Sequence, residues 1–477
     1  MSTYEEIDEL KERHVCCRCV GDEFLAQQIE SLGARRKCFY CSHVERSFSV
    51  EAISKLTAEA FEQHFVRTPD NPSSYESSLQ ADKESDYEWY RDGYPVTDVI
   101  VDAVGVSENI ARDIQCVLED EHQPLDSSEM GEEREFSTDS HYIEAVQGES
   151  YLHDKWHEFE RILKTETRFF NREAFTLLES IFKDLNQIQI SNGKALIRKV
   201  GPGEKLNAFF RARTFQSHDD LENALKRPDL RLASPPSTLA KAGRLNSGGI
   251  SVFYGATSAK VAVAEVRPPV GSEVVVASFK VTRPLTLLDL TVLERIVERG
   301  SFFDPAYKQR LERAAFLKYL SQRMTRPVLP NDESLEYLPT QAVADFLATL
   351  TDPELDGILY PSVQSNASGL NVMLFHKASA VKKLPINDNV DISVTTAVHY
   401  EDGWEQDYSV YVWSTEESDV DSISNFESLD VLSDYPEEVD GHEESLELDL
   451  SSIEVCIVKR VDVDFEQHAV SWIQGNN

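Results

Sequence analysis

Apolar residues recur at three- and four-residue spacing through much of the first 200 positions, and this period predicts packed amphipathic helices. The clearest stretch runs over 151–187. Its apolar positions are expected to form one buried helical face: Trp156, Phe159, Ile162, Leu163, Phe169, Phe170, Phe175, Leu178, Ile181 and Phe182. Clusters of proline, glycine and small polar residues at 69–74 and 201–203 interrupt the pattern. The first half of the chain is therefore predicted to be mainly α-helical.

The second half alternates predicted strands with predicted helices. Strands are expected over 250–254, 273–281, 285–290, 357–360 and 371–375, and helices over 259–266, 304–324 and 339–348. Three later stretches alternate apolar and polar residues with period two, as strands do: 391–400, 406–413 and 453–465. With the helical first half, this pattern predicts an α+β protein.

A chain of 477 residues exceeds one ordinary hydrophobic core, so several structural units are expected. Four are predicted: a small cysteine-containing unit over 1–68, a helical domain over 69–200, a mixed domain over 201–385, and strands over 386–477 with an acidic insertion at 416–449. No apolar run approaches the roughly 18 residues of a membrane span. The first residues lack the basic and apolar regions of a secretory signal, so a cytoplasmic location is expected.

The formal net charge of −37 disfavours nucleic acid as a main partner, because a phosphate backbone is bound mainly by lysine and arginine. Acidic residues concentrate in 119–139 and 416–449, and the second of these stretches contains no lysine or arginine. Both stretches are interpreted as solvated loops. The alternative is a docking strip for a basic partner.

Four of the seven cysteines form two short pairs, Cys16-x2-Cys19 and Cys38-x2-Cys41, with 18 residues between them. This spacing is typical of four-cysteine zinc sites, and in a reducing compartment it favours metal binding over disulfides. A closed site with four thiolate ligands leaves no position for water. We therefore predict a structural Zn²⁺ that stabilises a small N-terminal unit, with four free cysteines as the alternative.

A short helix is expected between the two cysteine pairs, because Leu25, Ile29 and Leu32 recur at helical spacing. The zinc ion would hold both ends of this helix. Cys17 or His43 could replace one of the four ligands.

Polar residues of restricted types stand where predicted elements of the second half begin or end. They occur in this order: Phe210-Arg211-Ala212-Arg213, Gly243-Arg244-Leu245-Asn246, Phe253-Tyr254-Gly255-Ala256, Ala264-Glu265-Val266-Arg267, Tyr360-Pro361-Ser362 and Gly369-Leu370-Asn371. The order resembles the RES domain, a family named for its Arg, Glu and Ser, whose members are bacterial toxins that act on the nicotinamide–ribose bond of NAD. The resemblance covers roughly 201–375, and it implies an ADP-ribosyltransferase-like fold there.

The resemblance implies catalytic roles for five residues. Glu265 would stabilise the oxocarbenium-like ribose that forms when nicotinamide leaves. Arg211 and Arg244 would bind the pyrophosphate, since the planar guanidinium pairs with two phosphate oxygens at once. Tyr254 would present an aromatic face to the nicotinamide or the ribose, and Ser362 would hydrogen-bond the carboxamide or a ribose hydroxyl. The ordinary alternatives are a solvent-facing glutamate, structural arginine ion pairs, a core tyrosine and a turn serine.

Three further residues are predicted to contact NAD+ or to shape its pocket. Arg213 is a second candidate for the pyrophosphate. Asn246 and Asn371, together with Gly249 and Gly369, are expected to form turns, because asparagine and glycine tolerate left-handed backbone.

The resemblance predicts an NAD+ glycohydrolase, with water as the acceptor of the ADP-ribosyl group. Phosphate as the acceptor would make the protein a phosphorylase, and a macromolecular acceptor would make it an ADP-ribosyltransferase. A partner-binding module without activity is the alternative from another class. The expected partners are an antitoxin or a phage-derived trigger, and a second copy of the chain.

The N-terminal half is similar to the HEPN-type helical extension that precedes some RES domains in defence against phage. HEPN ribonucleases use an arginine and a histidine separated by four to six residues. Within the helical domain over 69–200 only Arg134 and His141 have that spacing, and they lie outside a predicted helix. Ribonuclease activity is therefore not predicted.

Overall fold

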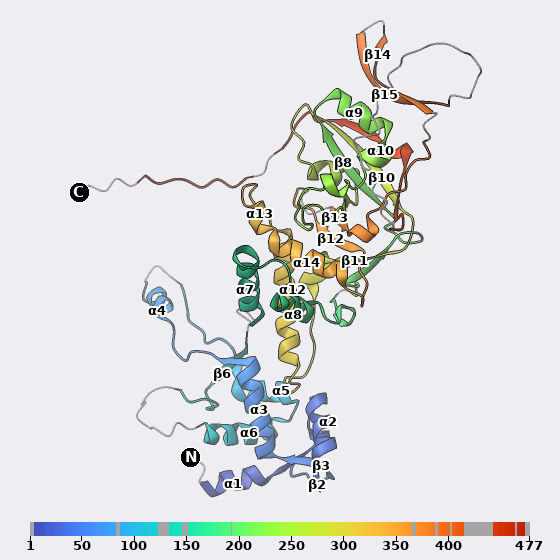
Figure 1. Cartoon of the computed structure of the whole chain (residues 1–477). Coiled ribbons are helices and arrows are strands. Elements are labelled where there is room, and N and C mark those ends of the chain that lie inside the picture. The colour runs from blue at the N-terminus through green and yellow to red at the C-terminus, as the bar shows by residue number, and fades with distance from the viewer. Residues whose placement is uncertain are drawn as a thin grey trace, which may run out of the picture. The chain divides into compact units, whose positions relative to one another are not determined.

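The computed structural model describes residues 4–82, 86–122, 133–145, 151–191, 193–364, 369–386, 390–400, 403–414, 442–462 and 465–472. The chain divides into two compact units, one formed by 1–154 with 298–316 and the other by 155–297 with 317–477. Helices and strands are both abundant, which confirms the predicted α+β class (Figure 1). The four predicted domain boundaries stay predictions. Among the described residues, none of the helices combines the length and apolar composition that a bilayer span requires.

The first unit contains two small sheets with the strand orders β1-β3-β2 and β4-β6-β5. Its strands are β1 (His14–Cys16), β2 (Ala34–Lys37), β3 (Val44–Ser49), β4 (Phe65–Arg67), β5 (Tyr94–Pro95) and β6 (His141–Glu144). Its helical segments are α1 (Tyr4–Glu12), η1 (Cys17–Cys19), α2 (Glu23–Leu32), α3 (Val50–His64), α4 (Ser74–Ala81), α5 (Val96–Val104) and α6 (Glu108–Glu121). The helix predicted between the cysteine pairs is α2. It buries Leu25 and Ile29, whereas Leu32, its last residue, is exposed.

Residues from late in the sequence complete the core of the first unit. Helices α3, α5 and α6 pack through apolar side chains, and Phe303 is buried among them. Phe302 packs against Phe65 with ring centroids 4.9 Å apart and against His64 at 5.2 Å. The segment 298–316 thus belongs to the N-terminal core, although sequence patterning placed it in the mixed domain.

The second unit is built on one large sheet. Nine strands of the described residues form it, in the order β16-β10-β8-β9-β13-β12-β11-β7, with β17 also paired to β10. They are β7 (Ile197–Val200), β8 (Ala208–Phe215), β9 (Phe253–Ala256), β10 (Glu273–Val281), β11 (Leu285–Asp289), β12 (Gly357–Pro361), β13 (Leu370–Leu374), β16 (Leu446–Leu448) and β17 (Glu454–Ile457). Strand β9 begins at Phe253, later than predicted, and β17 is shorter than the predicted 453–465.

Helical segments of the second unit precede β7 or lie between the strands in sequence, and α7 and α12 carry residues of both units. They are α7 (Tyr151–Thr165), α8 (Arg172–Phe182), η2 (Leu185–Gln187), α9 (His218–Lys226), α10 (Pro228–Arg231), η3 (Ser237–Leu239), α11 (Ala259–Glu265), η4 (Leu290–Arg295), α12 (Tyr307–Thr325), α13 (Glu333–Glu336), α14 (Leu338–Thr349), η5 (His376–Ala378) and η6 (Leu450–Ser452).

The two faces of the large sheet are packed differently. Strand β10 reads as a nearly continuous apolar run and is buried along almost its whole length, as expected of a strand covered on both faces. One face carries a large apolar core that includes Phe253, Val372 and Leu374. The other face carries a smaller cluster in which Val261 of α11 packs on Ala256 of β9. Helix α11 therefore covers the second face.

The apolar stripe of 151–187 is only partly core. Seven of its ten predicted residues are buried, but Phe169, Phe170 and Phe175 are exposed by 81%, 103% and 55%. Phe169 and Phe170 lie between α7 and α8, where no partner element covers them among the described residues. The prediction of one buried face was wrong for these three residues.

Strands β14 (Val390–Tyr400) and β15 (Gly403–Ser414) form a separate hairpin, which extends from the body of the second unit in Figure 1. They match the predicted period-two stretches. The hairpin contacts the unit through Thr396, whose hydroxyl lies 2.9 Å from His218 Nε2 of α9, and through Tyr408, which donates to Glu273 at 2.7 Å. Most of the acidic insertion predicted at 416–449 lies outside the described residues.

Candidate functional site

Glu265 and Ser362 meet on the α11 face of the large sheet. Glu265 is the last residue of α11, a helix that begins where the Ser258 side chain accepts a hydrogen bond from the amide of Val261. Ser362 directly follows β12 and is 4% exposed. Its hydroxyl donates to Glu265 Oε1 at 2.5 Å. Two residues 97 positions apart thus form one charge-assisted hydrogen bond, the shorter and stronger kind.

A glycine allows α11 to lie close to the sheet. The amide of Ser362 donates to the carbonyl of Gly369 at 3.0 Å, just before β13. A Cβ atom at Gly369 would lie 2.1 Å from Val261 Cγ2 of α11, well inside van der Waals contact. Gly369 therefore permits the approach that brings Glu265 to Ser362; the residue was predicted to form a turn.

Gly369→Ala is expected to destabilise the protein by about 1–3 kcal/mol, because the added methyl group forces α11 away from the sheet. Denaturant unfolding followed by circular dichroism measures the change. Gly248→Ala is the matched control, since its Cβ would come no closer than 3.8 Å to any neighbouring atom. Equal unfolding midpoints for the two variants would contradict the predicted steric role.

Tyr254 lies in β9 and anchors the loop that contains Arg244. Its hydroxyl donates to Asn246 Oδ1 at 2.9 Å and accepts from the amide of Leu245 at 3.2 Å. The Asn246 amide group donates in turn to the carbonyls of Lys241 at 3.0 Å and Ile250 at 3.2 Å. Asn246 pairs with Gly243 across a short turn, although its backbone is not left-handed. Because these hydrogen bonds occupy the Asn246 side chain, this residue would shape the site and would not bind a ligand directly.

Arg244 lies beside the end of α12. Its guanidinium donates to the carbonyls of Met324 at 3.3 Å and Arg326 at 2.5 Å, and it lies over the ring of Tyr337 at 5.3 Å. A cation is favourable at the C-terminus of a helix. The carbonyl of Arg244 accepts from Thr340 Oγ1 of α14 at 2.6 Å, so two helices fix this loop.

Arg211 and Arg213 project from β8. Arg211 donates to the carbonyl of Tyr254 at 3.2 Å and lies over the Phe253 ring at 5.1 Å, and Arg213 donates to the carbonyl of Arg231 at 2.6 Å. Phe253 belongs to the large apolar core, so the Arg211 guanidinium lies between that core and the backbone of β9. Burial, and then the charge of Arg213, lower the pKa of Arg211 to about 9.

The three arginines share one property. In the part of the chain that the structure describes, each donates to backbone carbonyls, and none forms an ion pair with a carboxylate. The predicted alternative of structural ion pairs therefore does not hold for the described carboxylates. A guanidinium that is buried without an anion is unfavourable in the free protein and would be stabilised by a bound anion.

Tyr360 and Asn371 lie on the α11 face with Glu265, whereas Arg211 and Arg213 pair with Ala277 and Val275 of the large core and so lie on the opposite face. Register pairs Asn371 with Ala256 on one side and with Tyr360 on the other. The pKa of Tyr360 is raised well above its ordinary value by burial first, and the charges of Glu265 and Arg244 also act on it. Burial likewise raises the pKa of Tyr254. Both phenols therefore stay protonated in one shared neighbourhood with Glu265 and Arg244.

Asn371 does not form a turn, contrary to the prediction, since it lies inside β13. It is 3% exposed, and its Oδ1 has no hydrogen-bond partner among the described residues. Sequence reasoning gave no role to Tyr360, although it quoted the residue within the Tyr-Pro-Ser motif. The role of Tyr360 depends on which residues lie opposite it in the sheet, and the local sequence around Tyr360 does not predict them.

Arg267 is a further residue that sequence reasoning left without a role. It follows α11 with a left-handed φ of 45°, which is uncommon for residues other than glycine and asparagine. With the Gln364 amide oriented so that its oxygen faces Arg267, that oxygen accepts from Nη2 at 2.8 Å and Nε at 3.2 Å. This pair links the end of α11 to the segment after Ser362, and so supports the Glu265–Ser362 contact.

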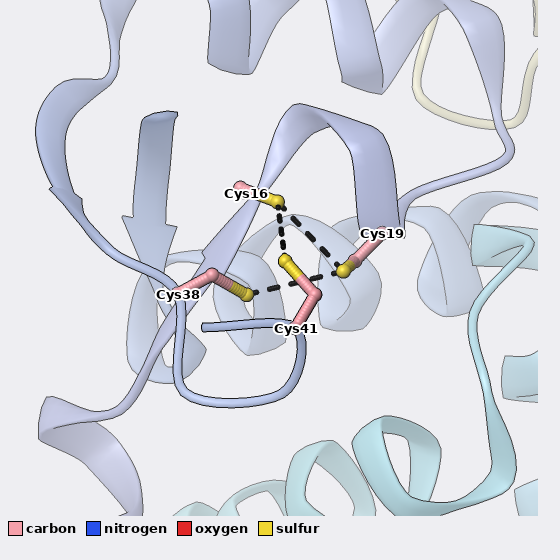
Figure 2. A group of neighbouring side chains, drawn as sticks. All are labelled: Cys16, Cys19, Cys38 and Cys41. Atoms are coloured by element: carbon pink, nitrogen blue, oxygen red, sulfur yellow. Dashed lines mark hydrogen bonds between the residues drawn. The ribbon is translucent and has the colours of Figure 1, made fainter. Parts of the chain in front are cut away.

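The four paired cysteines form a second candidate site, in the first unit. Figure 2 shows the side chains of Cys16, Cys19, Cys38 and Cys41 turned toward one another, and their ligand atoms all lie within 4.8 Å. The sulfur–sulfur distances are 3.7 Å for Cys16–Cys19, 3.5 Å for Cys16–Cys41 and 3.9 Å for Cys19–Cys38. Tetrahedral Zn²⁺ with bonds of about 2.3 Å would separate its sulfur ligands by about 3.8 Å. These three distances are close to that value, so the donor set and its spacing fit a zinc ion.

The surroundings of the cluster differ from one thiol to another. Burial raises the pKa of Cys16 and of Cys19. At Cys38 burial acts in the same direction, but backbone hydrogen bonds, led by that from Cys41, outweigh it and lower the pKa to about 7. Such backbone donors favour a thiolate, the form that binds metal. Cys17 and His43, predicted as possible substitutes, are not members of the group.

The fold and the site together define a mixed α+β protein with a polar site on the face of a large sheet that α11 covers. Residues 217–395 match the family model of the RES domain, so this part of the chain is a RES domain, of a family linked to NAD-related toxin-like proteins. The matched range contains Arg244, Tyr254, Glu265 and Ser362, whereas Arg211 precedes it. No curated protein matches the chain.

Proposed function

We propose that the protein is an NAD+ glycohydrolase, whose RES domain cleaves the bond between nicotinamide and ribose. The observation that carries the proposal is the hydrogen bond from Ser362 to Glu265. It brings the glutamate and the serine of the resemblance into one half-buried site, beside the protonated phenols of Tyr254 and Tyr360. An ADP-ribosyltransferase-like fold for this domain is part of the proposal.

Glu265 would act on the ribose. When the bond between C1′ and the pyridinium nitrogen breaks, its electron pair goes to the nitrogen, nicotinamide leaves as a neutral molecule, and the ribose becomes oxocarbenium-like. A carboxylate already fixed in place stabilises this charge without reorganisation. Ser362 would hold Glu265 in position. Water then adds at C1′ and loses a proton, and the product is ADP-ribose.

The arginines would bind the pyrophosphate. Arg211 is half-buried, reaches the carbonyl of Tyr254 from the large-core face and has no described carboxylate partner, and among the described residues Arg244 likewise donates only to carbonyls. A pyrophosphate supplies several anionic oxygens and would compensate these charges. In a chain with a net charge of −37, arginines that meet none of the described carboxylates support an anionic ligand.

ADP-ribose is expected to raise the midpoint of thermal unfolding of the parent protein, and Arg211→Met is expected to lose most of that shift. Ligand at about 100 times its Kd stabilises by about 2.7 kcal/mol. Arg198→Met is the matched control, because Arg198 on β7 already lies 3.9 Å from Asp289. Differential scanning fluorimetry measures all three. A shift retained in Arg211→Met would remove this arginine from the pyrophosphate site.

The direct test incubates the purified full chain with NAD+ and follows nicotinamide and the second product by chromatography, with and without phosphate. ADP-ribose as the second product supports the glycohydrolase. A phosphate-dependent product would make the protein a phosphorylase, and label transferred to a macromolecule would make it an ADP-ribosyltransferase. Absence of turnover, with or without lysate from phage-infected cells, would favour a partner-binding module.

Cleavage of NAD+ would make the protein a toxin-like effector in a toxin–antitoxin or anti-phage system. A cell that contains such an enzyme needs an antitoxin, or a trigger that releases its activity, and these are the proposed partners. The first unit is the proposed sensing half. In the structure Arg134 and His141 lie outside helices, so nothing in their placement favours HEPN ribonuclease chemistry.

A further inference from the structure

The buried side-chain oxygen of Asn371 lies in the proposed NAD+ site and has no hydrogen-bond partner among the described residues. The residue is 3% exposed. Buried polar groups in native proteins are almost always hydrogen-bonded, so an exception calls for an explanation. A ligand that donates a hydrogen bond to this oxygen would satisfy it.

Strand register shows which way Asn371 faces. Successive side chains of β13 point to alternate faces of the sheet, and Val372, which follows Asn371, belongs to the large apolar core. Asn371 therefore faces the side covered by α11, as does Ala256, its partner in β9. Tyr360, directly opposite in β12, faces the same way.

The groups around Asn371 favour a flat ring with an N–H donor. Tyr360 lies directly opposite, and Tyr254 lies two positions from Ala256 on the same face of β9. Ser362, two positions from Tyr360, holds Glu265, which would act at the ribose carbon that carries the nicotinamide. The ring attached to that carbon is therefore the part of the substrate that would reach Asn371.

On the basis of the proposed function, we propose that Asn371 Oδ1 accepts a hydrogen bond from the carboxamide of nicotinamide, so that the enzyme selects NAD+ over nicotinic acid adenine dinucleotide. The two dinucleotides share their ribose, pyrophosphate and adenine groups. They differ only where the amide of one is replaced by a carboxylate in the other. A carboxylate has no N–H to donate, and it places a negative charge beside the carbonyl oxygen of Asn371.

The selection is expected to be about 10- to 100-fold in kcat/KM, because a site built to bond a donor rejects an analogue that lacks it. If Oδ1 instead bonds a ribose hydroxyl, the two dinucleotides should be cleaved alike. The ratio of kcat/KM for the two dinucleotides is therefore a specific measure of the carboxamide contact. A purely structural role for Asn371 would not change that ratio.

The experiment measures kcat/KM of the full chain for NAD+ and for nicotinic acid adenine dinucleotide. It is repeated with Asn371→Leu, which has a similar size and no acceptor, and with Asn371→Asp, which keeps an acceptor oxygen. We expect the ratio to fall to within about threefold of unity in the leucine variant and to persist in the aspartate variant. Thermal unfolding identifies any variant that fails to fold, and the parent ratio remains a test that needs no variant.

Equal rates for the two dinucleotides in the parent would overturn the inference and leave the proposed glycohydrolase standing. A preference retained in a folded Asn371→Leu would also overturn it. If the parent cleaves neither dinucleotide, the proposed function fails, and calorimetric binding then decides the inference separately. Tighter binding of NAD+ by about tenfold or more would support the contact, and equal binding would refute it.

Discussion

Glu265→Gln is expected to reduce the rate of NAD+ cleavage by about 10³-fold, while the protein stays folded. Glutamine keeps the size of the side chain and can still accept from the Ser362 hydroxyl, which lies 2.5 Å from Oε1 in the parent. It removes the negative charge that would stabilise the oxocarbenium-like ribose. The loss is therefore expected in kcat, because the interaction is made mainly in the transition state.

Chromatographic assay of nicotinamide release measures this effect, with Glu204→Gln as the matched control on an exposed glutamate of the same unit. Ser362→Ala should cause a smaller loss, since it removes only the group that positions Glu265. A folded Glu265→Gln protein that turns over NAD+ at the parental rate would make the catalytic assignment wrong. In cells the same variant should abolish toxicity.

Cys38→Ser is expected to abolish the predicted binding of zinc and to destabilise the first unit by several kcal/mol. A structural zinc ion contributes on the order of 10 kcal/mol of apparent binding free energy in small zinc peptides, and much of this is folding free energy. Cys38 is fully buried, and backbone donors lower the pKa of its thiol to about 7 against the opposing effect of burial. Serine cannot replace this thiolate as a ligand.

Zinc content by mass spectrometry and thermal unfolding with and without a chelator measure the effect. Cys17→Ser is the control, because Cys17 stands beside the cluster in sequence without belonging to it. If the parent binds no zinc, or if both variants lose zinc equally, the four-cysteine assignment is wrong.

The division of the chain affects how any fragment should be cut. Residues 298–316 lie within the RES-matched range, yet they belong to the first unit. A fragment that begins at Gly201 would keep Phe302 and Phe303 but lose their packing partners, Phe65 among them. The activity of such a fragment would therefore be affected by its newly exposed apolar surface as well as by the loss of any inhibition from the first unit.

Much of the local structure could be predicted because it is encoded locally. Strand β10 was predicted at its observed bounds and α11 within one residue of its observed end, because the apolar patterns of both elements are local features. The spacing of the cysteine pairs was sufficient to predict their convergence, because a zinc site needs only two short turns brought together by a small sheet. The order of Arg244, Tyr254, Glu265 and Ser362 was sufficient to indicate the RES domain.

Only the tertiary structure decided which side chains share a site. Ser362 reaches Glu265 because β9 lies beside β13 and β13 beside β12, an order that does not follow the sequence. Periodicity reports that a residue is apolar at a regular interval, but it does not report whether a partner covers it, which is why exposed Phe170 was predicted to be core. The unpaired oxygen of Asn371 likewise depends on strand register and on the helix above it. The sequence by itself determined the elements and the types of chemical groups; the pairing of distant strands determined which of those groups meet, because register fixes the face on which every side chain lies.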